Sequence, residues 1–135
     1  MPAATPNPGG EQVTPPTSTV LVVDDDRDIR ETLQEILEIE GYEVQTARNG
    51  AEGLERAREL RPAVILLDLF MPVMDGTEFR QRQLQDTQLA GIPVVIVSAA
   101  AGLEERIAAL GVAGHLEKPL DIEHLFDVVG RYCRC

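Results

Sequence analysis

Five short runs rich in Val, Ile and Leu alternate in this chain with stretches whose apolar residues recur at helical spacing. The runs are TVLVV (19–23), EVQTA (43–47), AVILL (63–67), PVVIV (93–97) and GHLE (114–117). The first stretch between runs places four apolar residues on one helical face: Ile29, Leu33, Ile36 and Leu37. Strict alternation requires crossover connections, and these produce a parallel sheet with helices on both faces.

Right-handed crossovers favour the flavodoxin-like strand order 2-1-3-4-5 for five strands. The sequence therefore predicts a three-layer α/β/α fold, with a doubly wound five-stranded parallel sheet and five helices. Asn49 with Glu52 forms a capping box for the second helix, and Asp121 caps the last helix. The third helix, which begins around DGTEF, is expected to bury Phe79 and Leu84.

The two ends of the chain differ in composition from the middle. Residues 1–18 hold five of the nine prolines and almost no bulky apolar residue, which predicts a disordered tail or linker. Residues 19–130 are long enough for one domain with a real core. Cys133 and Cys135 lie too close together, without His or further Cys, to form a metal site or a disulfide framework. We therefore expect residues 131–135 to be a frayed carboxyl terminus.

The charge balance excludes several classes of partner. A net charge of −11 repels phosphate backbones and anionic lipids, so neither direct nucleic-acid binding nor membrane binding is expected. No apolar run approaches the length of a membrane span, and the first basic residue is Arg27, too late for a secretory signal. The sequence therefore predicts a cytoplasmic domain.

Polar side chains follow four of the five predicted strands, and the second strand is the exception. In chain order they are Asp24, Asp25 and Asp26, then Asp68, then Ser98, and finally Lys118. In the order 2-1-3-4-5 the second strand lies beyond the first, so these side chains converge on one crevice. Asp26 and Asp28 have the alternative of capping a helix. Asp68 is harder to explain in this way, because it ends a strand of five apolar residues, where an acid is rare without a reason.

The residue types in this crevice indicate phosphoryl chemistry. Clustered carboxylates repel one another, and without a cation at least one should take up a proton. Hard oxygen ligands suit Mg²⁺, or Mn²⁺ in its place, better than a soft metal. A carboxylate such as Asp68 beside Mg²⁺ can attack a phosphoryl group, while Ser98 and Lys118 hold its oxygens. The product is an acyl phosphate that water can hydrolyse.

Four segments in this order, VLVVDDDRDIR, VILLDLFMPVMDG, VVIVSAA and LEKP, resemble the receiver domain of two-component response regulators such as the chemotaxis regulators. By this resemblance Asp68 accepts a phosphoryl group from a histidine kinase or a histidine phosphotransfer protein. Asp24, Asp25 and the backbone carbonyl of Phe70 bind Mg²⁺ together with Asp68. Such a domain is a phosphorelay signalling module rather than an enzyme, although it catalyses its own phosphorylation and dephosphorylation.

The resemblance also implies how the signal leaves the domain. Ser98 is the switch hydroxyl, Lys118 contacts the phosphoryl group, and the Lys118–Pro119 bond is expected to be cis. The response reaches an unidentified protein target through the face of the fourth helix, fifth strand and fifth helix. The domain acts as a monomer or as a phosphorylation-dependent dimer.

Two residues depart from the usual pattern of the family. His115 stands where the switch aromatic is commonly Tyr or Phe, and its ring can carry charge near neutrality. We therefore weigh a pH-dependent coupling to partner binding against a passive half-buried ring. Phe70 stands where small or polar side chains are common, and we predict that it hinders the hydrolytic water. The alternative is packing at the rim of the site.

Other functions remain open on the sequence alone. The chain is either a free-standing regulator or a receiver excised from a hybrid histidine kinase or multidomain regulator. A haloacid dehalogenase-type phosphohydrolase also uses an Asp at a strand end, but it would need a second acid where this chain has Phe70. A flavin carrier would need a Ser/Thr-rich loop after the first strand, where this chain has DDDRD.

Overall fold

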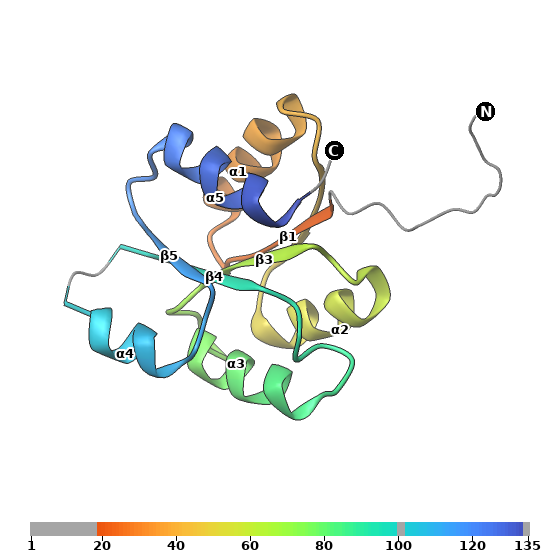
Figure 1. Ribbon diagram of the computed structural model, residues 1–135, viewed down its shortest axis with the longest axis vertical. Helices are drawn as coiled ribbons and strands as arrows, with labels where there is room; N and C mark the ends of the chain where they lie inside the picture. The colour runs from red at the N-terminus through yellow and green to blue at the C-terminus, as the bar shows by residue number, and fades with distance from the viewer. Residues whose placement is uncertain (1–18, 100–101, 134–135) are drawn as a thin grey trace, which may run out of the picture.

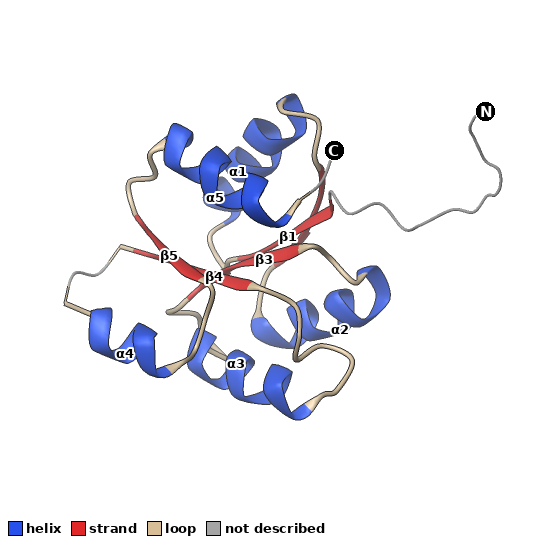
Figure 2. Cartoon of the chain, viewed as in Figure 1, coloured by secondary structure: helices blue, strands red, loops and turns tan. Residues whose placement is uncertain are grey.

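The computed structural model describes residues 19–99 and 102–133, in which strands and helices alternate without exception (Figures 1 and 2). The first six elements are β1 (Thr19–Val23), α1 (Arg27–Ile39), β2 (Glu43–Ala47), α2 (Gly50–Leu60), β3 (Val64–Asp68) and α3 (Gly76–Gln85). The last four are β4 (Val94–Ser98), α4 (Glu104–Ala109), β5 (Gly114–Glu117) and α5 (Ile122–Tyr132). The predicted disordered tail, 1–18, lies outside the described residues.

The strands form one parallel sheet in the order β2-β1-β3-β4-β5. Helices α1 and α5 cover one face of the sheet, and α2, α3 and α4 cover the other (Figure 1). The predicted flavodoxin-like fold with three layers is therefore confirmed. No helix in the described part of the chain is both long and apolar enough to cross a membrane.

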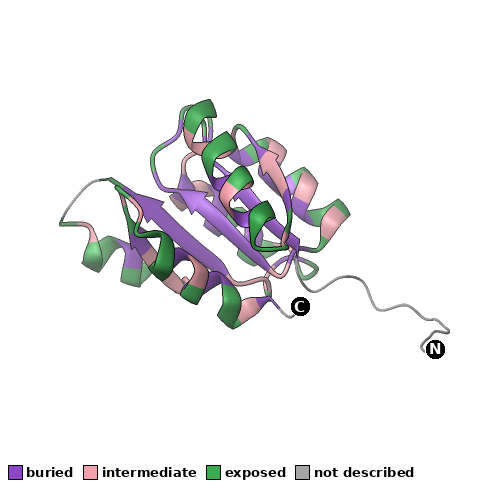
Figure 3. Ribbon diagram, turned by 90° about the horizontal axis from the view of Figure 1, so that it is seen from above, coloured by how far each residue is buried: buried purple, intermediate pink, exposed green. Residues whose placement is uncertain are grey.

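The sheet is buried on both faces, so its central strands are runs of apolar residues that do not alternate with polar ones, with polar residues only at strand ends (Figure 3). Leu21, Ile65 and Ile96 belong to the core under α2, α3 and α4. Val22 and Leu66 belong to the core under α1 and α5. Each such side chain stabilises the fold by about 1.5–3 kcal/mol when fully buried. The sheet is therefore a rigid platform for the loops at its carboxyl edge.

The predicted caps form, with one difference in detail. Asn49 Oδ1 accepts the N–H of Glu52 at 2.9 Å. Glu52 Oε1, however, accepts the N–H of Arg48 at 2.8 Å, one residue earlier than in a standard capping box. Asp121 Oδ1 accepts the first free N–H groups of α5, as expected.

The prediction that α3 buries Leu84 is wrong. Leu84 is half exposed, and the neighbouring Gln83 is completely buried instead. The Gln83 amide donates to the carbonyls of Leu89 and Ile92, at 2.8 and 2.9 Å. Gln83 therefore fastens α3 to the connection that leads into β4, and this turns Leu84 toward solvent.

The expected fraying from residue 131 onward is wrong for residues 131–133. Helix α5 continues to Tyr132, and Cys133 is 6% exposed. Cys133 packs in the same core as Val128 and Val129, and its N–H donates to the Val129 carbonyl at 3.0 Å. The apolar face of α5 thus extends one residue past the helix and holds this end against the domain.

Candidate functional site: an acidic crevice at the carboxyl edge of the sheet

The site lies where β1, β3, β4 and β5 end side by side. Strands β3 and β4 each end one residue later than predicted, so Asp68 and Ser98 are strand residues rather than the first loop residues. Asp68 pairs with Val97, and Ser98 pairs with Glu117. The ladder therefore fixes the backbone positions of both polar residues, which are buried.

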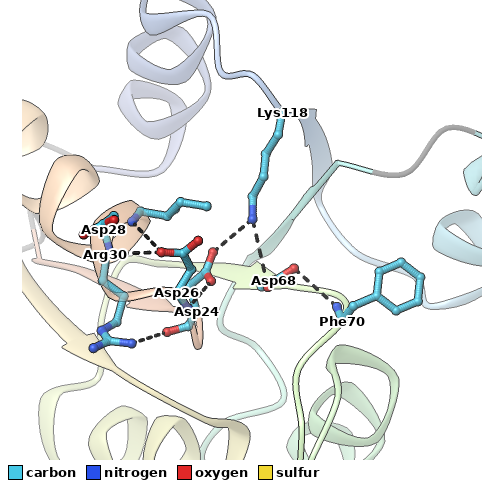
Figure 4. Close-up of polar contacts among 8 residues, drawn as sticks. Asp24, Asp26, Asp28, Arg30, Asp68, Phe70 and Lys118 are labelled. Carbon is cyan, nitrogen blue, oxygen red and sulfur yellow. Dashed lines mark hydrogen bonds and ion pairs between the residues drawn. The ribbon is translucent and has the colours of Figure 1, made fainter.

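Asp24 is held through both its side chain and its backbone at the end of β1 (Figure 4). Its Oδ1 accepts the N–H of Asp26 at 2.9 Å, and its Oδ2 accepts Lys118 Nζ at 3.2 Å. Its backbone carbonyl accepts Arg30 Nη1 at 2.8 Å. With only 2% of its surface exposed, Asp24 is a carboxylate fixed in orientation beside Asp68.

The acidic run after β1 divides into two roles. Asp26 Oδ1 accepts the N–H of Asp28 at 2.9 Å and that of Ile29 at 3.3 Å, so it caps α1. Asp24 and Asp25, in contrast, lie in the crevice with Asp68. The capping interpretation is thus correct for Asp26 and does not account for Asp24 or Asp25.

Lys118 reaches back across the crevice from the end of β5 (Figure 4). Its Nζ lies 3.2 Å from Asp24 Oδ2 and 4.0 Å from Asp68 Oδ2. Its own N–H donates to the Ser98 carbonyl at 2.9 Å, which continues the pairing of β4 and β5 by one residue. The Lys118–Pro119 bond is cis, as expected. One ammonium therefore contacts two carboxylates at once.

Burial and crowding raise the pKa of Asp68 to about 7. Loss of solvent is the largest cause, and the negative charge of Asp24 adds to it. Lys118 and the N–H of Phe70, which lies 3.3 Å from Asp68 Oδ1, act in the opposite direction. Asp68 thus carries negative charge only part of the time near neutral pH, and a bound cation would favour its ionised form.

Three carboxylates form a set that could hold a metal ion. Asp24, Asp25 and Asp68 each offer an oxygen, and these atoms lie within 4.8 Å of one another. Asp25 is exposed, so the site is open to solvent on one side. An all-oxygen set with an open side suits Mg²⁺, which keeps several waters, better than zinc. The residues present therefore fit the ion that the sequence predicts.

Phe70 and His115 lie outside this carboxylate cluster. The Phe70 ring is 46% exposed and directed away from the carboxylates of Asp24 and Asp68 (Figure 4). His115 pairs with Ile96, which places it on the face of the sheet covered by α2, α3 and α4. The His115 Nε2 atom is buried, and no residue in the described part of the chain forms a hydrogen bond with it.

Two arginines near the site were not predicted from the sequence. Arg30 supports the backbone of Asp24, and Arg106 on α4 lies over the Phe70 ring, 5.4 Å from its centroid. Arg30 stands in the segment DDDRDIR and could have been suspected from its position one helical turn after the acids. Arg106 has no such signal, because its contact joins α4 to the connection after β3, far away in the sequence.

A parallel sheet of this order, with an acid cluster and a lysine at its carboxyl edge, has the architecture of CheY-like domains. Residues 20–130 match the model of the response regulator receiver domain, and the chain belongs to that family. Members of this family interact with histidine kinases or phosphotransfer proteins.

Known proteins from several organisms resemble the chain. The response regulator MprA of Mycobacterium ulcerans (strain Agy99) is 41% identical over 108 residues, which cover 78% of this chain and 46% of that protein. The chemotaxis protein CheY4 of Vibrio cholerae is 35% identical with a TM-score of 0.79, over 86% of this chain and 98% of that one. The receiver domain of a histidine kinase from Syntrophus aciditrophicus is 28% identical with a TM-score of 0.77, over 85% of this chain and 89% of that one.

The chain spans about half the length of the curated relatives it matches, since 46% of the MprA sequence is covered. The solved structures, in contrast, are covered almost completely, at 98% for CheY4. The similarity therefore covers the receiver domain and does not extend to the other half of the curated relatives.

Proposed function

We propose that this domain accepts a phosphoryl group on Asp68 in a Mg²⁺-dependent reaction and thereby switches its binding to a protein target. The phosphoryl donor is a histidine kinase or a histidine phosphotransfer protein. The observation that carries the proposal is the position of Asp68, buried at a strand end beside Asp24, where the ammonium of the only lysine of the chain contacts both carboxylates.

The residues of the crevice have distinct roles in this proposal. Asp24, Asp25, Asp68 and the backbone carbonyl of Phe70 would hold Mg²⁺, and the bound ion would supply positive charge beside the phosphoryl oxygens. Asp68 must be ionised to act as nucleophile. One of its oxygens forms a bond to phosphorus while the bond from phosphorus to the donor breaks, and the donor leaves with that electron pair.

Lys118 and Ser98 stabilise the product. The Lys118 ammonium already lies between two carboxylates, so it can move to a phosphoryl oxygen when the charge on Asp68 is replaced by the larger charge of the phosphate. Ser98 would donate its hydroxyl to another oxygen. Both residues lie on β4 and β5 or directly after them, so these contacts shift the face formed by α4, β5 and α5 toward its active arrangement.

The haloacid dehalogenase alternative lacks its second acid. Position 70 carries a phenylalanine whose ring is directed away from the crevice, so no carboxylate stands there to protonate a leaving group. The chain resembles both a chemotaxis protein and the receiver domain of a histidine kinase, so the proposal covers a free-standing regulator and a receiver within a larger protein alike. We also propose that the domain acts in the cytoplasm.

The proposal is tested by offering the purified protein a small acyl phosphate, such as acetyl phosphate, with and without Mg²⁺. The protein mass should increase by one phosphoryl group only with Mg²⁺, and Asp68→Asn and Asp25→Asn should abolish or strongly reduce the increase. Arg131→Met, a change on the exposed side of α5, is the matched control and should leave it intact. Equal phosphorylation of Asp68→Asn would rule out Asp68 as the acceptor.

A further inference from the structure

Arg106 on α4 contacts the segment that carries Asp68 at two points. Its guanidinium carbon lies over the Phe70 ring, 5.4 Å from the centroid, as in a cation–π interaction. Its Nη2 donates to Thr77 Oγ1 in the first turn of α3, at 3.2 Å. Phe70 lies near the start of the connection between β3 and α3, and Thr77 lies just after its end, so Arg106 joins α4 to both sides of that loop.

Among the described residues, the Phe70 ring has no other contact of this kind to hold it. Its backbone N–H is bound to Asp68 Oδ1 at 3.3 Å, so the Cα of Phe70 is held at the rim of the acceptor. The side chain is 46% exposed, and in this structure the ring points away from the acceptor carboxylate (Figure 4). A half-exposed side chain exchanges between staggered rotamers on fast timescales, so a weak contact is enough to decide which rotamer dominates.

We propose that Arg106 is a positioning residue that holds the Phe70 ring beside α4 and so keeps the acceptor site open to solvent. This inference rests on the proposed phosphorylation of Asp68. When the contact with Arg106 is lost, the ring spends more time over the acceptor, where it excludes water and small phosphoryl donors. Arg106 thus sets the lifetime of the aspartyl phosphate by acting through Phe70.

The step that the ring controls is hydrolysis of the acyl phosphate. A water oxygen attacks phosphorus, the bond from phosphorus to the Asp68 oxygen breaks, and its electron pair returns to the carboxylate. The water gives up its protons to solvent and to the phosphate that leaves. Because the water must approach opposite the Asp68 oxygen, an apolar ring in that path lowers the rate without touching the bond that breaks.

The expected effect is modest because Arg106 and Phe70 are both partly exposed. Exposed cation–π contacts correspond to a change of about two- to fivefold in a conformational equilibrium. We therefore expect Arg106→Met to slow hydrolysis of the aspartyl phosphate about two- to fivefold. Phe70→Asn, which has no ring to cover the site, should hydrolyse at least as fast as the wild type.

The experiment is a double-mutant cycle on the rate of aspartyl phosphate loss, with the single variants Arg106→Met and Phe70→Asn and the double variant. Arg106→Met should slow the loss in the wild-type background and have no effect in the Phe70→Asn background. Arg106→Lys retains a cation over the ring and should restore most of the rate. Arg131→Met is the control for removal of an exposed arginine and should change nothing.

An equal effect of Arg106→Met in both backgrounds would overturn the proposal, because the charge would then act directly on the phosphate. Unchanged hydrolysis in Arg106→Met would overturn it as well. In the unphosphorylated protein, NMR should show ring-current shifts of the Arg106 side-chain protons that disappear in Phe70→Asn, and their absence in the wild type would also contradict this position of the ring. A protein that takes up no phosphoryl group in any variant refutes the proposed function itself, and uptake without dependence on Arg106 refutes only this inference.

Discussion

Lys118 shows how strongly a single side chain is constrained in this crevice. Every other basic residue of the chain is an arginine, yet the position after β5 carries a lysine. Its Nζ lies 3.2 Å from Asp24 Oδ2 and 4.0 Å from Asp68 Oδ2, and the side chain is 17% exposed. A compact ammonium can serve two oxygens on different residues, whereas a planar guanidinium is wider and prefers both oxygens of one carboxylate.

Replacement of Lys118 by Arg should therefore preserve the fold and weaken the switch. We expect the unfolding midpoint in urea to change little, because Lys118 contributes no side chain to either core. The gain in target affinity on phosphorylation should fall by about tenfold, within the usual range of coupling between sites. Titration of the phosphorylated and unphosphorylated forms with the target measures this gain. A Lys118→Arg variant that keeps the full gain would show that the shape of the cation is unimportant, and Arg27→Lys is the control.

Asp68 should make the domain less stable as the pH rises toward neutrality. Its pKa is about 7 in the folded state, above the value of about 3.9 for an unfolded chain. Between these values the folded protein binds more protons than the unfolded chain. The stabilisation from protonated Asp68 is therefore fully present below about pH 4 and is lost as the pH rises through about 7.

Replacement of Asp68 by Asn should remove this pH dependence. We compare the free energies of unfolding of Asp68→Asn and the wild type in the absence of divalent ions. The difference, variant minus wild type, should increase by about 2 kcal/mol as the pH rises from about 5 to about 8. The full shift would correspond to about 4 kcal/mol, and we expect less because Asp68 shares the site with Asp24 and some solvent. Urea unfolding at both pH values measures the difference. Parallel profiles for the two proteins would show that Asp68 is ionised throughout.

The loop between β3 and α3 contains one residue with a strained backbone, Val73. Val73 has a φ of 70°, a left-handed conformation that is costly for a β-branched side chain. The same side chain is 87% exposed, so it buries almost no surface in compensation. The loop is held instead at its ends, where Gly76 N–H donates to the Leu69 carbonyl at 2.8 Å.

Val73→Gly should consequently stabilise the protein. Relief of the left-handed conformation is worth about 1–2 kcal/mol, and the added freedom of glycine in the unfolded chain offsets part of it. We expect a net gain of about 0.5–1 kcal/mol in the free energy of unfolding, measured with urea. Val73→Ala keeps a Cβ at the same φ and should gain less. If alanine and glycine are equivalent, strain at Val73 is not the cause.

Strand β5 carries the second unusual position, His115. Its Nε2 is buried, and nothing in residues 19–99 or 102–133 bonds to it. A buried polar atom without a partner costs about 1–3 kcal/mol. The ring lies on the face of the sheet covered by α2, α3 and α4, and α4 belongs to the face proposed above to switch target binding.

His115→Phe tests both consequences of this ring. The variant should be more stable by about 1 kcal/mol, because it removes an unsatisfied nitrogen. If the imidazole couples phosphorylation to partner binding, the gain in target affinity on phosphorylation should be smaller in His115→Phe than in the wild type. An unchanged gain in the variant would leave His115 as a passive ring.

For the molecule as a whole, the sequence predicts the architecture well because the architecture depends on periodicity. Alternating apolar runs and helical spacings determine a parallel sheet, and polar residues at strand ends then mark its functional edge. Contacts that depend on the rotation of a helix cannot be predicted in this way. The burial of Gln83 in place of Leu84 follows from hydrogen bonds to a neighbouring loop, and the burial of Cys133 follows from the packing of α5.

In the candidate site, too, some residues are predicted by their spacing in the sequence and others only by the packing of the folded chain. The carboxylates and Lys118 follow from their positions after the strands, whereas the separation of Asp26 from Asp24 required the cap geometry of α1. The contact of Arg106 with Phe70 depends on how α4 lies against a distant loop, and no spacing in the sequence encodes it.

The central claim is that Asp68 is the phosphoryl acceptor of this domain. The most direct measurement is to treat the protein with acetyl phosphate and Mg²⁺, reduce the acyl phosphate with borohydride, and locate the modified residue by peptide mass spectrometry. Reduction converts an aspartyl phosphate to homoserine, so the account predicts homoserine at position 68 and unmodified residues at positions 24 and 25. Homoserine at position 24 or 25, or an unmodified position 68 in a protein that has taken up phosphate, would contradict it.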